Sequence, residues 1–218
     1  MAPTALLADR LILRAEDGSA LPLDPGRWHA EPSVEEEAFL ATMAPPVLDV
    51  GCGPGRLVLS LARRGAVALG VDPAPAAVVL ARDRGATVLQ RSVFDPLPGQ
   101  GRWRTILLAD GNIGIGGDPA RLLRRCRDLL AADGTVVVEV EASPPGATSG
   151  WRHYRVRLER GHQCGPWFNW AVVGADAIAG LAAVAGLGLL RLQPLATEGR
   201  CFAHLGRPQP GKRSIAAG

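Results

Sequence analysis

Short apolar runs alternate with amphipathic stretches through the middle of the chain. The apolar runs have the length and composition of buried strands. They lie at residues 47–50, 66–71, 86–90, 103–109 and 135–140. Apolar residues recur at helical spacing between them, over 56–64, 75–84 and 119–132. Strands that alternate with helices in this way predict an α/β fold, doubly wound, with a mostly parallel sheet.

Capping residues mark the starts of two helices. Ser33 and Glu36 form a capping box, which predicts a helix over about 34–43 that ends before Pro45-Pro46. Asp118 followed by Pro119 is an N-cap with proline at the first helical position. Residues 1–32 predict an irregular N-terminal arm with a short hairpin around Asp17-Gly18, so that the arm and first helix together span 1–44.

The pattern changes after Gly150. Alternating residues over 152–159 predict a strand within a small antiparallel insertion, 150–173. A helix over 175–186 and strands over 187–193 and 200–205 follow. Residues 207–218 are polar and predict a flexible tail, so that 1–206 form a single domain.

The insertion is rich in aromatic residues. It holds five of the ten in the chain: Trp151, Tyr154, Trp167, Phe168 and Trp170. Together with Trp28 and His29 of the arm, they are suited to form a lid over a flat or apolar substrate. An ordinary hydrophobic mini-core explains the same residues equally well.

Composition and charge exclude several classes of protein. Of the 218 residues, 47% are hydrophobic and 21% are charged, which is ordinary for a globular protein. The net charge is only +3 and no basic run exceeds two residues, so a nucleic-acid partner is not expected. No apolar stretch approaches the roughly 18 residues of a membrane span. We therefore expect a cytoplasmic protein without a nucleic-acid or membrane partner. We also expect a monomer or a homodimer, although composition does not distinguish the two.

The four cysteines are scattered and form no CxxC pair, so neither a disulfide framework nor a zinc ribbon is expected. His162 and Cys164 could join Cys201 and His204 in a four-ligand metal site. However, Cys201 and His204 lie on a predicted strand, where residues three apart point to opposite faces. We therefore predict no metal site.

The first turn from strand to helix carries the strongest motif. Asp49 is followed by Gly51, Gly53 and Gly55 in the spacing G-x-G-x-G. Glycines let the backbone approach a ligand closely, and the following helix start offers unpaired N–H groups. A dinucleotide site would instead have G-x-G-x-x-G, with glycine in place of Arg56. An acid at position 49 would also repel a pyrophosphate, which disfavours a nicotinamide-dependent oxidoreductase.

This motif resembles that of the class I S-adenosylmethionine-dependent methyltransferases. The resemblance implies that the amino-acid part of the cofactor lies along Gly51, Gly53 and Gly55, with Asp49 nearby. Asp72, at the end of the second strand, corresponds to the family's acid that binds the ribose hydroxyls, although it could also cap a helix.

The third motif of the family is matched by the segment that follows the third strand. Asp95 corresponds to the acid near the adenine amine, and Phe94 to a residue beside the ring. A turn residue before proline is the alternative reading of Asp95. The matching stretch covers about 46–142, the expected cofactor-binding core, and the later strands fit the family's seven-stranded Rossmann-like sheet.

The glycine-rich loop over 110–117 follows the fourth strand, where ligands bind in parallel sheets. In the family this loop lies near the methyl-bearing sulfur, so we expect Asp110 to contact the cofactor and Asp110 and Asn112 to orient the nucleophile. We expect the glycines of both loops to face the same cofactor. His153 is the candidate general base, with His162, Glu141 and Tyr154 as alternatives.

The chain departs from two branches of the family. It lacks the Asn/Asp-Pro-Pro-aromatic motif of amino-methylating nucleic-acid enzymes after its fourth strand. After the fifth strand, Glu139 and Glu141 stand where metal-dependent relatives have an Asp-Asn pair. The predicted function is metal-independent methyl transfer from S-adenosylmethionine to a small molecule. The alternative is a protein that binds this cofactor in a non-methylating role, as a repurposed cyclase or regulatory pseudoenzyme.

Overall fold

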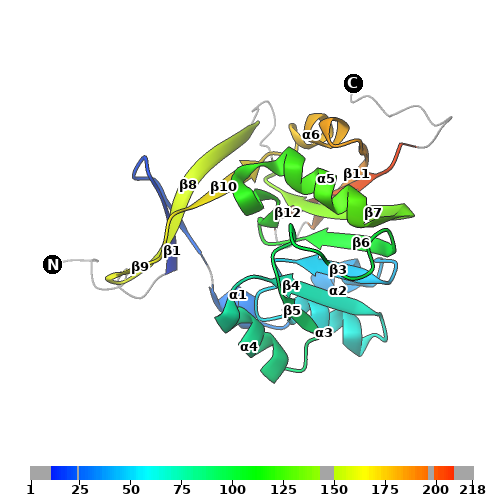
Figure 1. The fold of residues 1–218 in the computed structure, drawn as a ribbon, viewed down its shortest axis with the longest axis horizontal. Helices are drawn as coiled ribbons and strands as arrows, with labels where there is room; N and C mark the ends of the chain where they lie inside the picture. The colour runs from blue at the N-terminus through cyan, green and yellow to red at the C-terminus, as the bar shows by residue number, and fades with distance from the viewer. Residues whose placement is uncertain (1–10, 24, 143–149, 196–198, 209–218) are drawn as a thin grey trace.

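A seven-stranded sheet forms the centre of the molecule (Figure 1). The computed structural model describes residues 11–23, 25–142, 150–195 and 199–208. The strand order is β11-β12-β7-β6-β3-β4-β5, with β12 antiparallel to both of its neighbours and the other pairings parallel. The strands are β3 (Val47–Val50), β4 (Ala68–Asp72), β5 (Val88–Gln90), β6 (Trp103–Leu108), β7 (Leu130–Val140), β11 (Gly188–Leu195) and β12 (Arg200–Gly206).

Helices cover both faces of this sheet, as the sequence predicts. Phe39, Leu57 and Leu61 pack with Val137 and Phe202 on one face. The helices of that face are α2 (Val34–Leu40), α3 (Arg56–Arg63) and α4 (Pro75–Asp83). The other face is covered by α5 (Pro119–Leu129) and α6 (Ile178–Val184). The predicted doubly wound, mostly parallel α/β fold is therefore confirmed.

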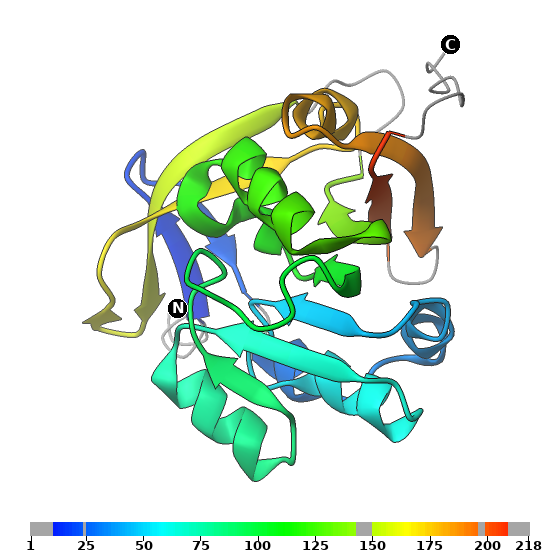
Figure 2. The same ribbon diagram turned by 45° about the vertical axis from the view of Figure 1, so that its right-hand side comes forward.

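A second, antiparallel sheet joins the N-terminal arm to the insertion (Figure 2). We call it the cap sheet, and its order is β10-β8-β1-β2, with the short β9 beside β8. Its strands are β1 (Leu11–Ala15), β2 (Ala20–Pro22), β8 (Trp151–Arg160), β9 (Gln163–Cys164) and β10 (Phe168–Val173). The hairpin at Asp17-Gly18 is confirmed. The sequence did not reveal that the arm pairs with the insertion, because pairing across about 140 residues leaves no local signal.

Several boundaries differ from the prediction. The helix expected over 119–132 ends at Leu129, because Leu130 is buried and already pairs with Trp103 on β6. The helix expected over 175–186 begins only at Ile178. Residues 112–117 form η2 (Asn112–Gly117), two short 3-10 turns separated by a kink at Ile115 and Gly116, instead of an open loop. The predicted tail lies outside the described residues from 209 onward, as do arm residues 1–10.

The glycines of η2 allow the cap sheet to pack closely against this segment. A Cβ at position 114 would lie 2.2 Å from the carbonyl oxygen of Ala171 and 2.6 Å from the indole of Trp170. A Cβ at position 117 would lie 2.8 Å from the His153 ring. The expectation that these glycines face the cofactor is wrong for Gly114 and Gly117, because their close neighbours belong to the cap.

Candidate functional site

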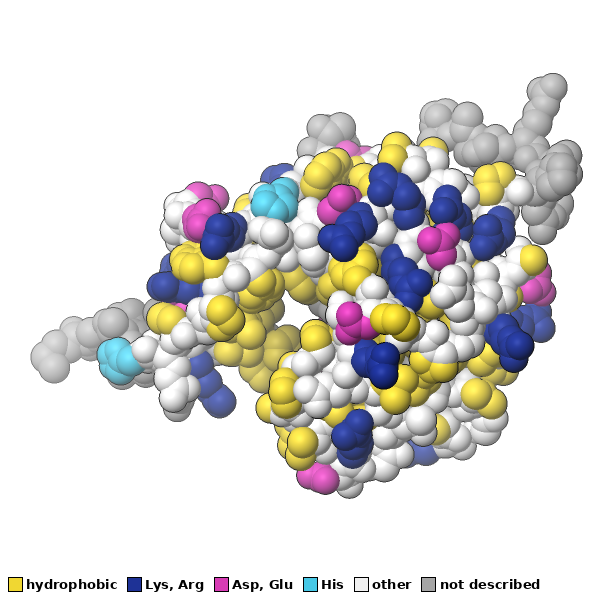
Figure 3. Space-filling model, viewed as in Figure 1, with side chains coloured by type: hydrophobic (Ala, Val, Ile, Leu, Met, Phe, Trp, Pro, Cys, Tyr) yellow, Lys and Arg dark blue, Asp and Glu magenta, His cyan; other side chains and the backbone are white. Residues whose placement is uncertain are grey.

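A cavity of about 470 Å³ opens where the cap sheet faces the carboxyl ends of β3 and β4. Figure 3 shows this side of the molecule hollowed and bordered by hydrophobic side chains. Several of the residues singled out from the sequence line it: Asp49, Gly51, Gly53, Asp72, Asp110 and Asn112. The cap contributes apolar residues, among them Leu13, Phe168 and Trp170. Trp28 and His29 of α1 (Pro25–His29) also line the cavity, as the arm-and-insertion lid predicts.

The glycine motif forms a tight turn on the floor of the cavity. Gly51, Gly53 and Gly55 all have positive φ, of 73°, 53° and 79°. Gly55 lies outside the cavity lining, and a Cβ there would approach Ala86 to 2.8 Å. Its role in the structure is therefore to let the start of α3 pack against the residues around α4.

Asp49 is the most isolated charged group of the site. It is 2% exposed, and its Oδ2 has no hydrogen-bond partner among the described residues. Burial, reinforced by the nearby charge of Asp110, raises the pKa of Asp49 to about 7. A buried carboxylate oxygen without a partner is unfavourable by itself, so this position is suited to a ligand that brings a donor or a positive charge.

Asp72 lies at the end of β4, beside the glycine turn. Its Oδ2 accepts a hydrogen bond from the Gly53 N–H at 3.0 Å, and its Oδ1 accepts one from the Ala74 N–H at 2.8 Å. The N-cap of α4 is Ala74, so Asp72 does not cap the helix itself but holds the turn that leads into it. Each carboxylate oxygen has two lone pairs, so both oxygens can accept a further bond from a ligand hydroxyl.

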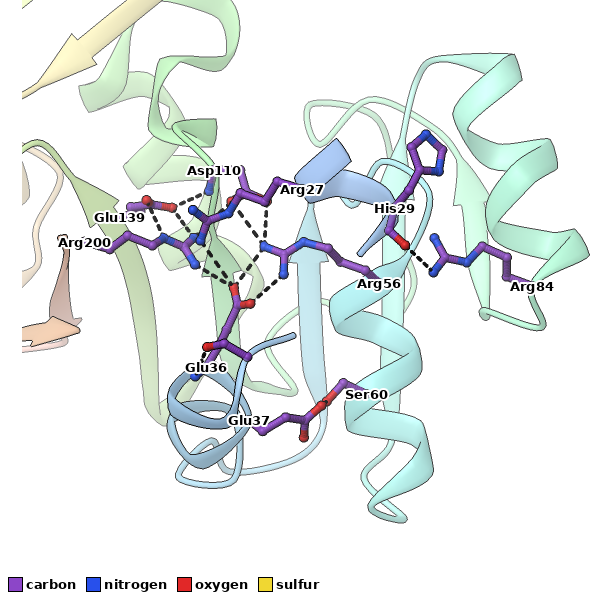
Figure 4. A network of polar contacts seen from close by, with 11 residues as sticks. Arg27, His29, Glu36, Glu37, Arg56, Ser60, Arg84, Asp110, Glu139 and Arg200 are labelled. Atoms are coloured by element: carbon purple, nitrogen blue, oxygen red, sulfur yellow. Dashed lines mark hydrogen bonds and ion pairs between the residues drawn. The ribbon is translucent and has the colours of Figure 1, made fainter. Parts of the chain in front are cut away.

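A buried network of ion pairs lies behind the cavity (Figure 4). Glu36 of α2 bonds to Arg56 of α3 at 2.6 and 2.9 Å and to Arg200 of β12 at 2.6 Å. Arg56 and Arg200 also donate to Asp110, at 3.1 and 3.0 Å. Although burial raises the pKa of Glu36, its bonds with Arg56 and Arg200 outweigh burial and hold that pKa below its usual range.

The network extends to both sides of Asp110. Arg200 pairs with Glu139 of β7, whose carboxylate also accepts the N–H of Asp110. Arg27 of α1 lies 3.6 Å from Asp110. Asp110 itself has a positive φ of 52°, which is uncommon for a residue with a side chain. The network therefore fixes Asp110 from several elements, and Asp110 stays a predicted site residue.

Sequence reasoning missed most of this network. Glu36 was predicted as part of a capping box, yet its carboxylate turns inward to Arg56 and Arg200 while Ser33 accepts the Glu36 N–H. Arg56 stood out only as the residue that replaces a glycine. The usable signal was a charged residue at the start of an otherwise apolar helix, because such a group must find a buried partner.

Three further predicted residues make contacts within the protein; Asn112 lines the cavity, whereas Phe94 and Asp95 lie outside its lining. The side chain of Asn112 donates to the carbonyl oxygens of Val50 and Gly51, so it joins two loops. Phe94 lies under the guanidinium of Arg121, 4.4 Å from its ring centroid. Asp95 accepts the Ser92 N–H at 2.9 Å, which fits its alternative reading as a turn residue.

His153, the candidate base, is exposed on β8 beside Gly117 and lies outside the cavity lining. Among the described residues, no group of three His, Cys, Asp or Glu side chains could hold a metal ion. His204 instead contacts Gln193. Within the same residues, every helix is too short or too polar to cross a membrane.

A second cavity, of about 610 Å³, adjoins the first. Four residues line both cavities: Leu13, Leu23, Asp110 and Trp170. The second cavity is further lined by Glu139, Glu141 and Arg200 and by apolar residues of β2 and η2. The shared wall makes the two cavities neighbouring compartments of one site.

Comparison with known proteins identifies the family. A family model described as a methyltransferase domain matches residues 10–191, most of the chain. This chain belongs to that methyltransferase family. The methyltransferase is also similar to a crystal structure of a SAM-dependent methyltransferase from Bacteroides fragilis in complex with S-adenosyl-L-homocysteine. The TM-score is 0.76 at 21% identity, over 93% of this chain and 89% of the other. The predicted Rossmann-like methyltransferase fold is thereby confirmed.

Two curated relatives match part of the methyltransferase. Both are ubiquinone biosynthesis O-methyltransferases. The one from Azorhizobium caulinodans is 33% identical over 97 residues, which are 42% of this chain and 38% of that protein. The one from Pseudomonas paraeruginosa is 32% identical over 123 residues, 52% of this chain and 51% of that protein. The chain thus spans about half or less of the length of these relatives.

Proposed function

We propose that this methyltransferase transfers the methyl group of S-adenosylmethionine to a small-molecule acceptor without a metal ion. The observation that carries the proposal is the partnerless, buried Oδ2 of Asp49 in the cavity floor. The α-amino group of the cofactor is a cation with hydrogen-bond donors, so it meets the requirement of this oxygen. Gly51 and Gly53 leave room for the cofactor's amino-acid part beside it.

The remaining cavity residues fit other parts of the same cofactor. The lone pairs left on Asp72 suit two ribose hydroxyls, because one carboxylate can accept from both. Asp49, Asp72 and Asp110 also make the lining acidic, which suits a cofactor with a positively charged sulfur. Phe94 and Asp95 stay predictions for the adenine, since they lie outside the cavity lining.

S-adenosylmethionine, when bound, would supply a sulfonium methyl group to a lone pair of the acceptor, with the electrons of the broken carbon–sulfur bond kept by sulfur and the proton of a hydroxyl acceptor passed to a base or to solvent. The chain's own contribution is positioning, which can supply much of the rate of such a reaction. Asp110, held by Arg56 and Arg200, lies in the wall shared by the two cavities. The apolar cap residues keep water away from the reacting atoms.

The proposal also covers the acceptor atom, the residues that orient the acceptor, and the location of the protein in the cell. The names of the curated relatives favour a hydroxyl oxygen as the acceptor atom. Asp110 and Asn112 stay the residues proposed to orient the acceptor, and the exposed His153 is the weaker candidate for a base. All four cysteines are free, as is usual in the reducing cytoplasm, where we place a monomer or homodimer.

Calorimetry with S-adenosylhomocysteine tests the proposal. We expect binding of this compound and no binding of NADH. The purified protein is then incubated with S-adenosylmethionine and a metabolite extract in the presence of EDTA, and demethylated cofactor is measured. Binding without turnover in any extract would favour the non-methylating alternative. NADH binding without S-adenosylhomocysteine binding would reject the cofactor assignment.

A further inference from the structure

The second cavity has a charge balance that bears on the acceptor. Three acids line it, Asp110, Glu139 and Glu141, together with Arg200. Each of them is ion-paired. Asp110 and Glu139 pair with Arg200, and Glu141 pairs with Arg152 at 3.3 Å. Including Glu36, Arg27 and Arg56 behind the wall, four carboxylates face four guanidinium groups.

This balance leaves no surplus charge for a charged acceptor. An ionic ligand at Asp110 or Glu139 would have to compete with Arg200, which is only 6% exposed, whereas the pair of Glu141 with Arg152 is 50% and 47% exposed and lies at the rim. Separating Arg200 from either of its partners leaves a buried charge unpaired, which is strongly unfavourable. Recognition of an uncharged molecule requires no such separation.

The wall between the two cavities also favours an uncharged acceptor, because part of it is apolar and flat. Leu13, Leu23 and Trp170 form its apolar part and belong to one hydrophobic cluster of the cap. The rings of Trp170 and Phe168 lie 6.1 Å apart and nearly perpendicular, at 87°. Trp170 is held in place because its indole lies against Gly114, so it presents a rigid flat surface.

We propose that the second cavity binds an uncharged, flat aromatic acceptor against Trp170, and that Trp170 determines this specificity. This inference rests on the proposed function, since it assigns the acceptor of the same reaction. Trp170 lines both cavities, so a ring packed on it lies next to the cofactor cavity. Leu21 of β2 lines the second cavity alone and extends the apolar surface outward.

A matched set of ligands tests the chemical class of the acceptor. The ligands are 2-naphthol, its anionic analogue 6-hydroxy-2-naphthoic acid, its cationic analogue 6-(aminomethyl)-2-naphthol, and the non-planar decahydro-2-naphthol. Their binding to the full chain saturated with S-adenosylhomocysteine is measured by calorimetry. We expect 2-naphthol to bind at least about tenfold more tightly than each of the others, a difference of about 1.4 kcal/mol. Tighter binding of a charged or non-planar analogue, or no binding of 2-naphthol, overturns the inference.

Two variants test whether the acceptor binds in the second cavity. Trp170→Phe should weaken 2-naphthol binding, and so should Leu21→Glu, which places a charge on a residue that is already 49% exposed and so tolerates the change. The controls are Trp151→Phe on the cap and Val184→Glu on α6. These residues are 46% and 65% exposed and lie outside both cavity linings. If Leu21→Glu and Trp170→Phe bind 2-naphthol as the controls do, the inference is wrong.

Failure of the proposed function and failure of the inference about the second cavity give different experimental results. Leu21→Glu and the two controls, whose residues lie outside the lining of the cofactor cavity, should still bind S-adenosylhomocysteine as the unmodified chain does, with unchanged thermal melting. Absence of S-adenosylhomocysteine binding by the unmodified chain rejects the proposed function itself. Normal cofactor binding combined with the wrong acceptor preference rejects only the inference about Trp170 and the second cavity.

Discussion

Asn112 occupies the space that a side chain at Gly51 would need. A Cβ at position 51 would lie 2.6 Å from the Nδ2 of Asn112. That amide group donates to the carbonyl oxygens of Val50 and Gly51, at 2.8 and 3.0 Å. The loop after β6 therefore supports the loop after β3, and the shape of the cofactor turn depends on a residue about 60 positions away.

Gly51→Ala should damage this turn more than Gly53→Ala. Both glycines have positive φ, so alanine at either costs about 1–2 kcal/mol in backbone strain. Only position 51 adds a clash with Asn112, worth about 1–3 kcal/mol more, because position 53 has no atom within 4 Å. Urea denaturation measures the two losses in free energy of unfolding. Equal losses would contradict the proposed packing of Asn112 on Gly51.

The pKa of Asp49 predicts a dependence on pH. Burial and the charges of Asp110 and Asp72 raise this pKa from 3.8 to about 7, against the opposing effect of Arg56. Because the folded pKa lies above the unfolded one, the free protein should lose stability as pH rises from about 4 to 7. Asp49→Asn should remove this loss and be more stable at pH 8, by up to about 4 kcal/mol.

The same group should control cofactor binding with the opposite sign. The ionised carboxylate attracts the cofactor's ammonium group, so affinity for S-adenosylhomocysteine should fall as pH falls below about 7. Asp49→Asn should bind weakly at every pH. Calorimetry at several pH values, with denaturation of the free protein alongside, measures both effects. A pH-independent affinity of the unmodified chain would contradict the role of Asp49.

Asp72→Ala should weaken binding of S-adenosylhomocysteine by roughly 1.5–3 kcal/mol, since charge-assisted hydrogen bonds are lost. Asp118→Ala is the matched control. Asp118 accepts the Arg121 N–H at the start of α5 and lies outside both cavity linings. Its replacement should lower stability by about 1 kcal/mol and leave affinity unchanged. If a folded Asp72→Ala protein keeps full affinity, Asp72 only holds the backbone at Gly53 and Ala74.

Glu36→Ala should destabilise the protein strongly, because Arg56 and Arg200 each lose a buried partner. We expect a loss of about 3–5 kcal/mol, the usual cost of breaking a buried pair from one side. Glu31→Ala breaks the exposed pair with Arg63 and should change stability little. Thermal or urea denaturation compares them. Similar small losses for both variants would show that the buried network adds little to stability.

The sequence predicted the parts of the fold that depend on local pattern. The five parallel strands, the helices between them and the glycine turn follow from apolar periodicity and capping residues near in sequence. The placement of Asp49, Gly51, Gly53 and Asp72 around one cavity follows as well, because carboxyl ends of parallel strands meet at one edge.

The sequence pattern did not predict contacts between segments that are distant along the chain. The pairing of β1 with β8, the turning of Glu36 toward Arg200, and the glycines of η2 that admit Trp170 all join residues far apart in the chain. Each is decided by how elements pack in space, for which a single sequence offers no periodic signal. The position of His153 outside both cavity linings could not be foreseen for the same reason, because strand pairing decides which face a residue occupies.

The bond between Glu36 and Arg200 also has a consequence for the order of folding on the ribosome. The sheet strands β3 to β7 are synthesised before residue 140, yet the ion network that backs the cofactor cavity needs Arg200 from the last strand. Until that strand emerges, Glu36 lacks one of its buried partners and is left with Arg56 and the more distant Arg27. A nascent chain therefore completes its ligand cavity only after β12 has been synthesised, when the helices around the cavity are already made.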